Sequence, residues 1–348
     1  MRNPSTPHHP TAARRVTAAL RLAAIAALAA CIAACHEPTG AGNAGRAETI
    51  TAAHVAQWVG RLAADSMRGR ETPSAGIESA VSTIGAYFQS LGLQPAFPSA
   101  SYTMRYATPA WGTTPAGTAP NAGAVLVGSD SVLKDQYVVV IAHGDGKGVR
   151  TPVGNDSIYN GADDNASGTA AVLEMAEALA GTDPHPRRSV LFLVVSGEEH
   201  GFWGTYAYLA NPTVPIGNIV AVFNFDMISR NSPDSIYGSG MNGSTLGDRL
   251  LEVVAGHPEE RMTFTPGPTG GSDHVPFWAR GVPFLMFFGG LHPDYHTPFD
   301  EAGRIDADKA ARVTRMAFYL ALRIADDDAR PAWKPGWPAP PAPGSQVH

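Results

Sequence analysis

Four apolar segments of this 348-residue sequence each stop next to residues that can bind a metal ion. The segments span residues 137–142, 189–196, 219–226 and 282–288. Their continuous apolar character is typical of strands that are buried on both faces of a sheet. Helical patterns lie between them, and a long closing helix is predicted over 307–325. This alternation predicts an α/β fold, namely a three-layer sandwich around a mainly parallel, mixed central sheet.

Polar residues follow these predicted strands at their carboxyl ends. In open α/β sheets, ligands bind beyond the carboxyl ends of the strands, so these side chains are expected to converge on one edge. A glycine-flanked acidic pair, Asp163 and Asp164, opens the helix predicted over 167–180 and adds a carboxylate to the same edge. The other side chains, in chain order, are His143, Asp145, Glu198, Glu199, Asp226, Tyr295 and His296.

The set contains nitrogen and oxygen donors only, which suits Zn²⁺, with Co²⁺ or Mn²⁺ as substitutes. Five ligands are more than one tetrahedral catalytic zinc uses. Two ions about 3.5–4 Å apart, bridged by one carboxylate and one water, would use them all. Neighbouring glutamates cannot easily serve one ion in the same way, so one of Glu198 and Glu199 is expected to bind metal. The other would face the bridging water as general base.

Six short motifs give the sequence a specific resemblance. It resembles the co-catalytic zinc aminopeptidases, the metallopeptidase family that also holds glutamate carboxypeptidase II and the glutaminyl cyclases. The resemblance covers residues 137 to 300 and implies a fold of the zinc-exopeptidase type with two zinc ions per chain. The motifs, in the family's order, are Ala-His143-Gly-Asp145, Gly161-Ala-Asp-Asp-Asn-Ala-Ser-Gly168, Ser196-Gly-Glu-Glu-His-Gly-Phe-Trp-Gly204, Asn224-Phe-Asp-Met227, Ser272-Asp-His274 and Tyr295-His-Thr-Pro-Phe-Asp300.

The resemblance assigns the five ligands to two ions. It implies that His143 and Asp226 hold the first ion and that Glu199 and His296 hold the second. Relatives keep a carboxylate at the fourth position of the Gly-x-x-Asp turn, which favours Asp164 over Asp163 as the bridge. A cis peptide bond is implied directly after that residue.

The resemblance also implies the roles of three residues beside the ions. Glu198 is the general base, and Asp145 orients the His143 imidazole. Tyr295 either donates a hydrogen bond to the tetrahedral intermediate or packs in the pocket wall.

The activity expected on this basis is that of an aminopeptidase, which hydrolyses N-terminal residues from peptides. Alternatives are a glutaminyl-cyclase-like acyltransferase with one zinc ion, a carboxypeptidase or dipeptidase of the same fold, or a non-catalytic binding lipoprotein. The 146–159 loop is expected to form a lid or rim.

Several other polar residues carry no site pattern in the sequence. Asp300 is expected to cap the following turn, the alternative being a residue that supports the ligands from behind. Residues 272–274 are expected to form a pocket-floor loop, since contiguous residues cannot build a serine triad. Five histidines are predicted to be surface or packing residues, namely His54, His185, His200, His257 and His292.

The N-terminus is predicted to be a lipoprotein signal peptide over residues 1–35, in which Cys35, or else Cys31, is lipidated. A flexible tether over 36–48, one metallopeptidase domain over 49–330 and a Pro-rich tail over 331–348 follow. We therefore expect an exported cell-envelope lipoprotein of a bacterium, on the periplasmic side or in the outer membrane, or alternatively a secreted protein. Charged residues make up 16% of the chain and the net charge is −6, which argues against nucleic-acid binding. The expected partners are peptides, with membrane contact through the lipid anchor alone and a monomeric state.

Overall fold

The computed structural model describes Met1 and residues 43–112 and 114–337. The predicted signal peptide with Cys31 and Cys35, and the tail beyond residue 337, lie outside the described residues. Among the described residues, no helix combines the length and the apolar character needed to cross a membrane.

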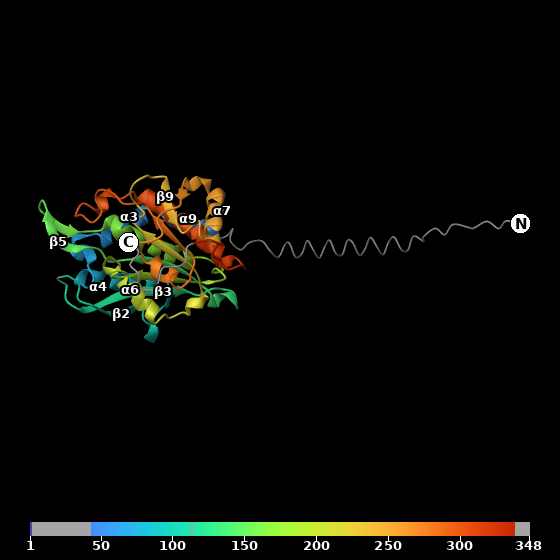
Figure 1. Cartoon of the computed structure of the whole chain (residues 1–348), viewed down its shortest axis with the longest axis horizontal. Helices are drawn as coiled ribbons and strands as arrows, with labels where there is room; N and C mark the ends of the chain where they lie inside the picture. Colours follow the sequence, from blue (N-terminus) through green and yellow to red (C-terminus); the bar gives the residue numbers. More distant parts are fainter. Residues whose placement is uncertain (2–42, 113, 338–348) are drawn as a thin grey trace. The chain divides into compact units, whose positions relative to one another are not determined.

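The centre of the domain is a nine-stranded sheet (Figure 1). Strands β7, β4, β8 and β11 lie side by side and run parallel, whereas β1, β2, β3 and β9 add antiparallel pairings. The mainly parallel, mixed sheet predicted from the sequence is thus confirmed. The strands are β1 (Gln94–Pro95), β2 (Thr103–Thr108), β3 (Gly117–Leu126), β4 (Tyr137–His143), β7 (Ser189–Val195), β8 (Ile219–Asp226), β9 (Ser235–Ser239), β10 (Thr263–Thr265) and β11 (Phe284–Phe288).

Helices cover both faces of this sheet. Five of them pack in one core cluster on one face, and α6 and α8 contribute to a separate cluster on the other. Alternate residues of β4 divide between the two clusters, because successive side chains of a strand point to opposite faces: Val138 and Val140 face one, and Val139 and Ile141 the other. The helices are α3 (Ala52–Leu62), α4 (Ala75–Ser90), α5 (Gly168–Ala180), α6 (Trp203–Ala210), α7 (Thr245–Gly256), α8 (His274–Trp278) and α9 (Ala307–Asp326).

The four predicted strands agree with the observed ones to within two residues, and the largest difference is at β11. The sequence predicted a strand from residue 282, but β11 begins at Phe284. Pro283 precedes it and has no N–H to donate to the sheet, although its carbonyl accepts a bond from the N–H of Val222 at 2.9 Å.

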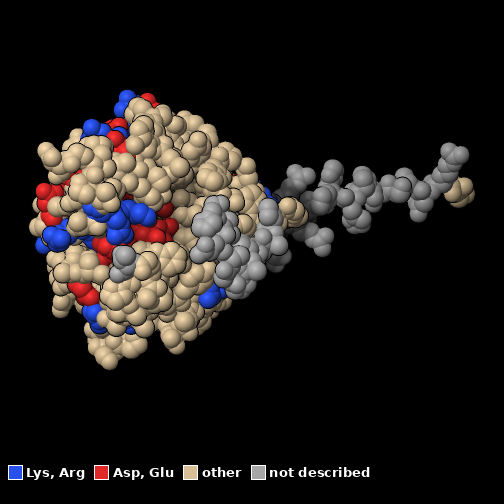
Figure 2. Space-filling view, turned by 60° about the vertical axis from the view of Figure 1, so that its left-hand side comes forward, with Lys and Arg blue, Asp and Glu red and all other residues tan. Residues whose placement is uncertain are grey.

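Residues 146–159, predicted to be a loop, form a two-stranded hairpin of β5 (Gly148–Val153) and β6 (Asp156–Tyr159). It projects at the side of the domain where β5 is labelled in Figure 1. That side is turned forward in Figure 2, where acidic side chains gather in a hollow next to a group of Lys and Arg.

Both ends of the described domain pack against it. Residues 43–48 belong to the predicted flexible tether, yet Asn43 is buried, its Nδ2 donates to the Pro184 carbonyl at 2.8 Å, and Ala47 lies in the core. At the other end, the indole N–H of Trp333 donates to the Gly281 carbonyl at 2.8 Å.

Candidate metal centre

Three parallel strands and two loops bring the predicted ligands to one edge of the sheet. His143 and Asp226 are the last residues of β4 and β8. Glu198 and Glu199 begin a short 3₁₀ turn, η6 (Glu198–His200), three residues beyond the end of β7. Their donor atoms form two triads, each with its atoms within 4.8 Å of one another: His143, Glu198 and Asp226 in the first, and Asp164, Glu199 and His296 in the second.

Asp164 lies between the two triads. Its Oδ1 is 3.5 Å from Nε2 of His143, and its Oδ2 is 3.0 Å from Nε2 of His296. Asp163 is engaged elsewhere, because its Oδ1 accepts hydrogen bonds from the N–H of Ser229 at 2.7 Å and from its hydroxyl at 2.6 Å. Of the two candidates in the sequence, Asp164 therefore has the position of a bridging ligand.

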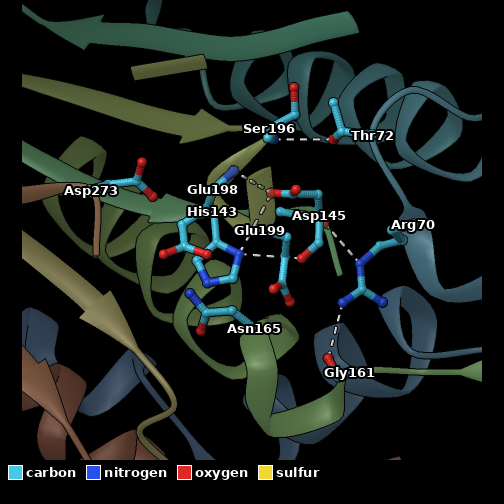
Figure 3. A network of polar contacts seen from close by, with 12 residues as sticks. Arg70, Thr72, His143, Asp145, Gly161, Asn165, Ser196, Glu198, Glu199 and Asp273 are labelled. Atoms are coloured by element: carbon cyan, nitrogen blue, oxygen red, sulfur yellow. Dashed lines mark hydrogen bonds and ion pairs between the residues drawn. The ribbon is translucent and has the colours of Figure 1, made fainter. Parts of the chain in front are cut away.

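Asp145 lies next to the imidazole of His143 (Figure 3). Its Oδ1 is 3.6 Å from Nδ1 of His143 and also accepts the backbone N–H of Glu198 at 3.3 Å. The Asp145 side chain is fully buried. It is thus placed to fix the ring so that Nε2 of His143 faces the triad.

Buried carboxylates dominate the electrostatics of the centre. Burial and the charge of Glu199 raise the pKa of Asp164 to about 7, and burial raises the pKa of Glu198 well above its usual range. Burial also acts to raise the pKa of Glu199, but hydrogen bonding to His296 and the charges of His296 and Lys147 outweigh it and lower the pKa to about 2. For His296 the balance is opposite: burial acts to lower the pKa, yet Asp164 and Glu199 raise it to about 9.

These residues fit a pair of divalent cations. Oε1 of Glu199 is buried without a hydrogen-bond partner. Two histidines and four carboxylates offer the nitrogen and oxygen donors that zinc accepts. A cation at each triad would supply the positive charge that the buried carboxylates lack.

Asp300 does not cap the following turn, which corrects the expectation from the sequence. Its carboxylate is buried, and it accepts the backbone N–H of Asp163 at 2.9 and 3.1 Å and that of Asp164 at 2.9 Å. It therefore holds the segment η5 (Ala162–Ser167), in which the peptide bond between Asp164 and Asn165 is cis, as the resemblance implied.

Arg70 is a residue of the centre that sequence reasoning did not identify. Its buried guanidinium donates to the carbonyls of Gly144 at 2.8 Å and Asn160 at 2.8 Å. It also donates to the carbonyl of Gly161 at 2.9 Å (Figure 3). It thereby ties the loop after His143 to the turn that carries Asp164. Burial lowers the Arg70 pKa to about 10, although neighbouring carboxylates favour the charged form. Its sequence context, Met67-Arg-Gly-Arg70, contains no pattern that would assign it a role.

Lys147, which directly precedes β5 of the hairpin, brings a second positively charged side chain to the centre. Nζ of Lys147 lies 2.9 Å from Oε2 of Glu199, and the Lys147 side chain is 29% exposed. A small pocket beside Asp164 is lined by Lys147, Tyr159 and His296. A larger cleft of about 540 Å³ follows the loops after β8 and β11 and is lined by residues that include Asn231, Tyr237, Phe288 and Leu291.

Tyr295 stacks on His296 with ring centroids 3.7 Å apart, and burial raises the pKa of its hydroxyl. Residues 272–274 are buried and do not form a triad: Ser272 accepts from Asn224 at 2.7 Å, and Asp273 accepts from Thr205 at 2.5 Å.

Two of the five remaining histidines have specific polar neighbours inside the protein. His292 is buried with its Nε2 3.3 Å from Oδ2 of Asp163, so it belongs to the surroundings of the acidic pair. His200 is buried, stacks near Trp203 and has its Nε2 2.9 Å from the Thr72 carbonyl.

Comparison with known proteins identifies the family. The family described as peptidase family M28 matches residues 121–321 of the sequence. Leupeptin-inactivating enzyme 1 of Streptomyces exfoliatus is 35% identical over 138 residues, which are 39% of this chain and 31% of that protein. A probable lipoprotein aminopeptidase, LpqL, of Mycobacterium tuberculosis is 32% identical over 180 residues, which are 42% of this chain and 36% of that protein. This chain thus spans about a third of the length of these curated relatives.

Two solved structures share the fold. A zinc aminopeptidase from Bacillus subtilis superimposes with a TM-score of 0.65 at 15% identity, over 81% of this chain and 97% of that one. The glutaminyl cyclase of Porphyromonas gingivalis superimposes with a TM-score of 0.63 at 17% identity, over 79% of this chain and 99% of that one. The three-layer zinc-exopeptidase fold predicted from the motifs is confirmed, and the chain belongs to peptidase family M28.

Proposed function

We propose that this member of peptidase family M28 is a zinc-dependent aminopeptidase that removes N-terminal residues from peptides. The observation that carries the proposal is the position of Asp164 between two triads that each contain a histidine. Curated relatives and a solved structure that bear the name aminopeptidase support the choice among hydrolases.

Two zinc ions are proposed, one at each triad. His143 and Asp226 would hold the first, Glu199 and His296 the second, with Asp164 shared between them. When bound, such ions polarise a substrate carbonyl and make a bound water acidic enough to attack at neutral pH.

Glu198 is proposed to carry the proton. It lies within 4.8 Å of donor atoms of His143 and Asp226, and burial raises its pKa. A carboxylate of raised pKa takes a proton from the attacking water readily and returns it to the leaving amine. Asp145 would keep the His143 imidazole in position during this transfer, since it contacts both the ring and the backbone of Glu198.

The proposed substrates are peptides with a free N-terminus. The free α-amine of such a peptide is a nitrogen donor that the proposed zinc ions would accept, whereas a blocked N-terminus is not. The 540 Å³ cleft beside the loops after β8 and β11 is large enough for amino-acid side chains and has both polar and aromatic walls. An exported, lipid-anchored monomer is proposed as well, on the N-terminal sequence pattern and on the similarity to a probable lipoprotein aminopeptidase.

The paired variants Glu198→Gln and Glu199→Gln test this assignment. We expect the wild type to hydrolyse amino-acid p-nitroanilides and free peptides but not N-blocked peptides. Glu198→Gln should keep the zinc count per chain and lose at least about 10²-fold in kcat, whereas Glu199→Gln should lose zinc. Unchanged turnover in Glu198→Gln would contradict the proposed base.

The zinc count separates this proposal from its main rival. One zinc ion in the candidate metal centre, together with release of pyroglutamyl products from N-terminal glutamine, would identify a glutaminyl-cyclase-like enzyme instead. Two ions in that centre and hydrolysis support the aminopeptidase.

A further inference from the structure

Two helices bring a second group of metal-binding side chains together outside the candidate metal centre. His54 comes from α3, and Glu174 and Glu177 come from α5. Residues three apart lie on the same face of a helix, so both glutamates can point to one place. One donor atom from each of the three residues lies within 4.8 Å of the others.

Glu174 is the buried member of this group. Its side chain is 1% exposed, its Oε1 has no hydrogen-bond partner, and its Oε2 is 3.7 Å from Nδ1 of His54. Burying a carboxylate without partners is unfavourable. Burial and the charge of Glu177 raise the Glu174 pKa to about 8.

Elsewhere among the described residues, buried carboxylate oxygens without partners gather around the candidate metal centre. Among the described residues, such oxygens belong to Asp145, Asp163, Glu199, Asp273 and Glu174. Glu199 is a proposed ligand, Asp145 lies beside the His143 ring, Asp163 directly precedes Asp164, and Asp273 lies within the electrostatic influence of His143. Glu174 is the exception, because it lies on α5 six residues past the first residue of the helix, about 9 Å along the axis.

The other two members of the group have the exposure and orientation of ligands. The His54 side chain is 48% exposed, which leaves a path for an ion and for water ligands. Oε2 of Glu177 accepts the hydroxyl of Tyr87 from α4 at 2.6 Å. A hydrogen bond of this kind orients a ligating carboxylate.

We propose that His54, Glu174 and Glu177 form an additional binding site for a divalent transition-metal ion, which we call the interhelical site. One imidazole and two carboxylates with an open side are a donor set that zinc accepts with water as the remaining ligand. The ion would neutralise the buried carboxylate and fasten α3 to α5. Since α5 directly follows η5, which carries Asp164, the ion would also stabilise the helix next to the candidate metal centre.

The rival explanation needs no metal. Glu174 would then be protonated, or paired with a protonated His54, and zinc would have no effect through these residues. The two explanations differ in the zinc count, which can be measured whether or not the protein is an aminopeptidase.

The experiment compares zinc per chain and thermal midpoint in the wild type, His54→Gln and Glu177→Gln, after chelation and re-equilibration with Zn²⁺. His257→Gln is the matched control, because His257 is also a surface histidine paired with one carboxylate, that of Glu259 at 2.9 Å. We expect each ligand variant to bind one ion fewer than the wild type and the control. The zinc-induced rise in thermal midpoint should shrink as well, while peptidase activity is kept.

The same loss of one ion is expected when His54→Gln is added to Glu199→Gln, which impairs the candidate metal centre. Equal zinc counts in the wild type, both ligand variants and the control would overturn the interhelical site. That result would leave the proposed function untouched, because the two sites share no residue.

Discussion

Asp300→Asn should weaken zinc binding although Asp300 is not a proposed zinc ligand. The Asp300 carboxylate accepts the N–H of Asp163 on both oxygens and the N–H of Asp164 on Oδ2. Asparagine keeps the shape of the side chain but offers one acceptor oxygen. If that oxygen takes the Oδ2 position, the amide NH₂ faces the N–H of Asp163, and two donors meet in a buried space.

The size of the effect follows from these contacts. Hydrogen bonds to a buried charge contribute about 1.5–3 kcal/mol each, neutral ones about 0.5–1.5, and a buried unpaired donor costs about 1–3. We therefore expect the free energy of unfolding to fall by roughly 2–4 kcal/mol, with a thermal midpoint lower by about 5–10 °C. Because the turn carries the bridging carboxylate, zinc affinity should fall by about 10- to 100-fold.

Urea unfolding in chelator and competitive zinc titration measure the two effects separately. Asp130→Asn is the matched control: Oδ1 of Asp130 accepts two backbone N–H groups at 2.8 and 2.9 Å in an exposed loop, and its Oδ2 pairs with the partly exposed Arg187, which precedes β7 at the end opposite the candidate metal centre. We expect the control to keep zinc affinity. An Asp300→Asn protein that loses stability but binds zinc like the wild type would refute the role of Asp300 in positioning Asp164.

Three further substitutions test other parts of the structure. Arg70→Met leaves several buried carbonyls without donors, so it should lower the free energy of unfolding by roughly 3–5 kcal/mol, as measured by urea unfolding. It should also reduce zinc affinity, as measured by zinc titration. Tyr295→Phe should reduce kcat at least about tenfold at an unchanged zinc count if its hydroxyl stabilises the intermediate, and an unchanged kcat would assign it to the pocket wall. In chelator, the raised pKa of Glu174 makes the free energy of unfolding depend on pH. The stabilising contribution of this one carboxyl group is fully present below about pH 4.5 and is lost as the pH rises towards about 8. Glu174→Gln should remove this loss, of the order of 3 kcal/mol, in denaturation curves recorded at pH 5 and pH 8.

The ligand set could be predicted from the sequence because each ligand follows an apolar strand. Strands of this kind run parallel in an α/β sheet, so their carboxyl ends had to meet, and His143 and Asp226 are the terminal residues of β4 and β8. The choice between Asp163 and Asp164 was open on the residues alone, because it depends on which side chain finds the N–H and hydroxyl of Ser229.

The residues that hold the ligands in place left no local pattern. Arg70 contacts carbonyls 74 to 91 residues away in the sequence, and Asp300 contacts backbone groups 136 and 137 residues away. A buried arginine or aspartate that donates to or accepts from loop backbone is indistinguishable in sequence from an exposed one. The contact of Lys147 with Glu199 was likewise hidden, because residues 146–159 show no strand signal strong enough to predict the hairpin.

Lys147 makes the two triads unequal, which leads to a prediction on the order of zinc binding. Its Nζ lies 2.9 Å from Oε2 of Glu199, and that same oxygen is 3.3 Å from Nε2 of His296. An ion at this triad must share the oxygen with the ammonium or displace it, whereas among the described residues no Lys or Arg pairs with the carboxylates of the first triad. Zinc should therefore fill the triad of His143 and Asp226 first.

Since Lys147 is partly exposed, its competition with zinc for the Glu199 carboxylate is worth about 1 kcal/mol, or roughly fivefold in Kd. Lys147→Met should tighten the weaker zinc site by that factor in a competitive titration and leave the stronger one unchanged, with Lys134→Met, in the exposed loop before β4, as the control. Equal affinities in Lys147→Met and the wild type would show that the ammonium moves aside without opposing the ion.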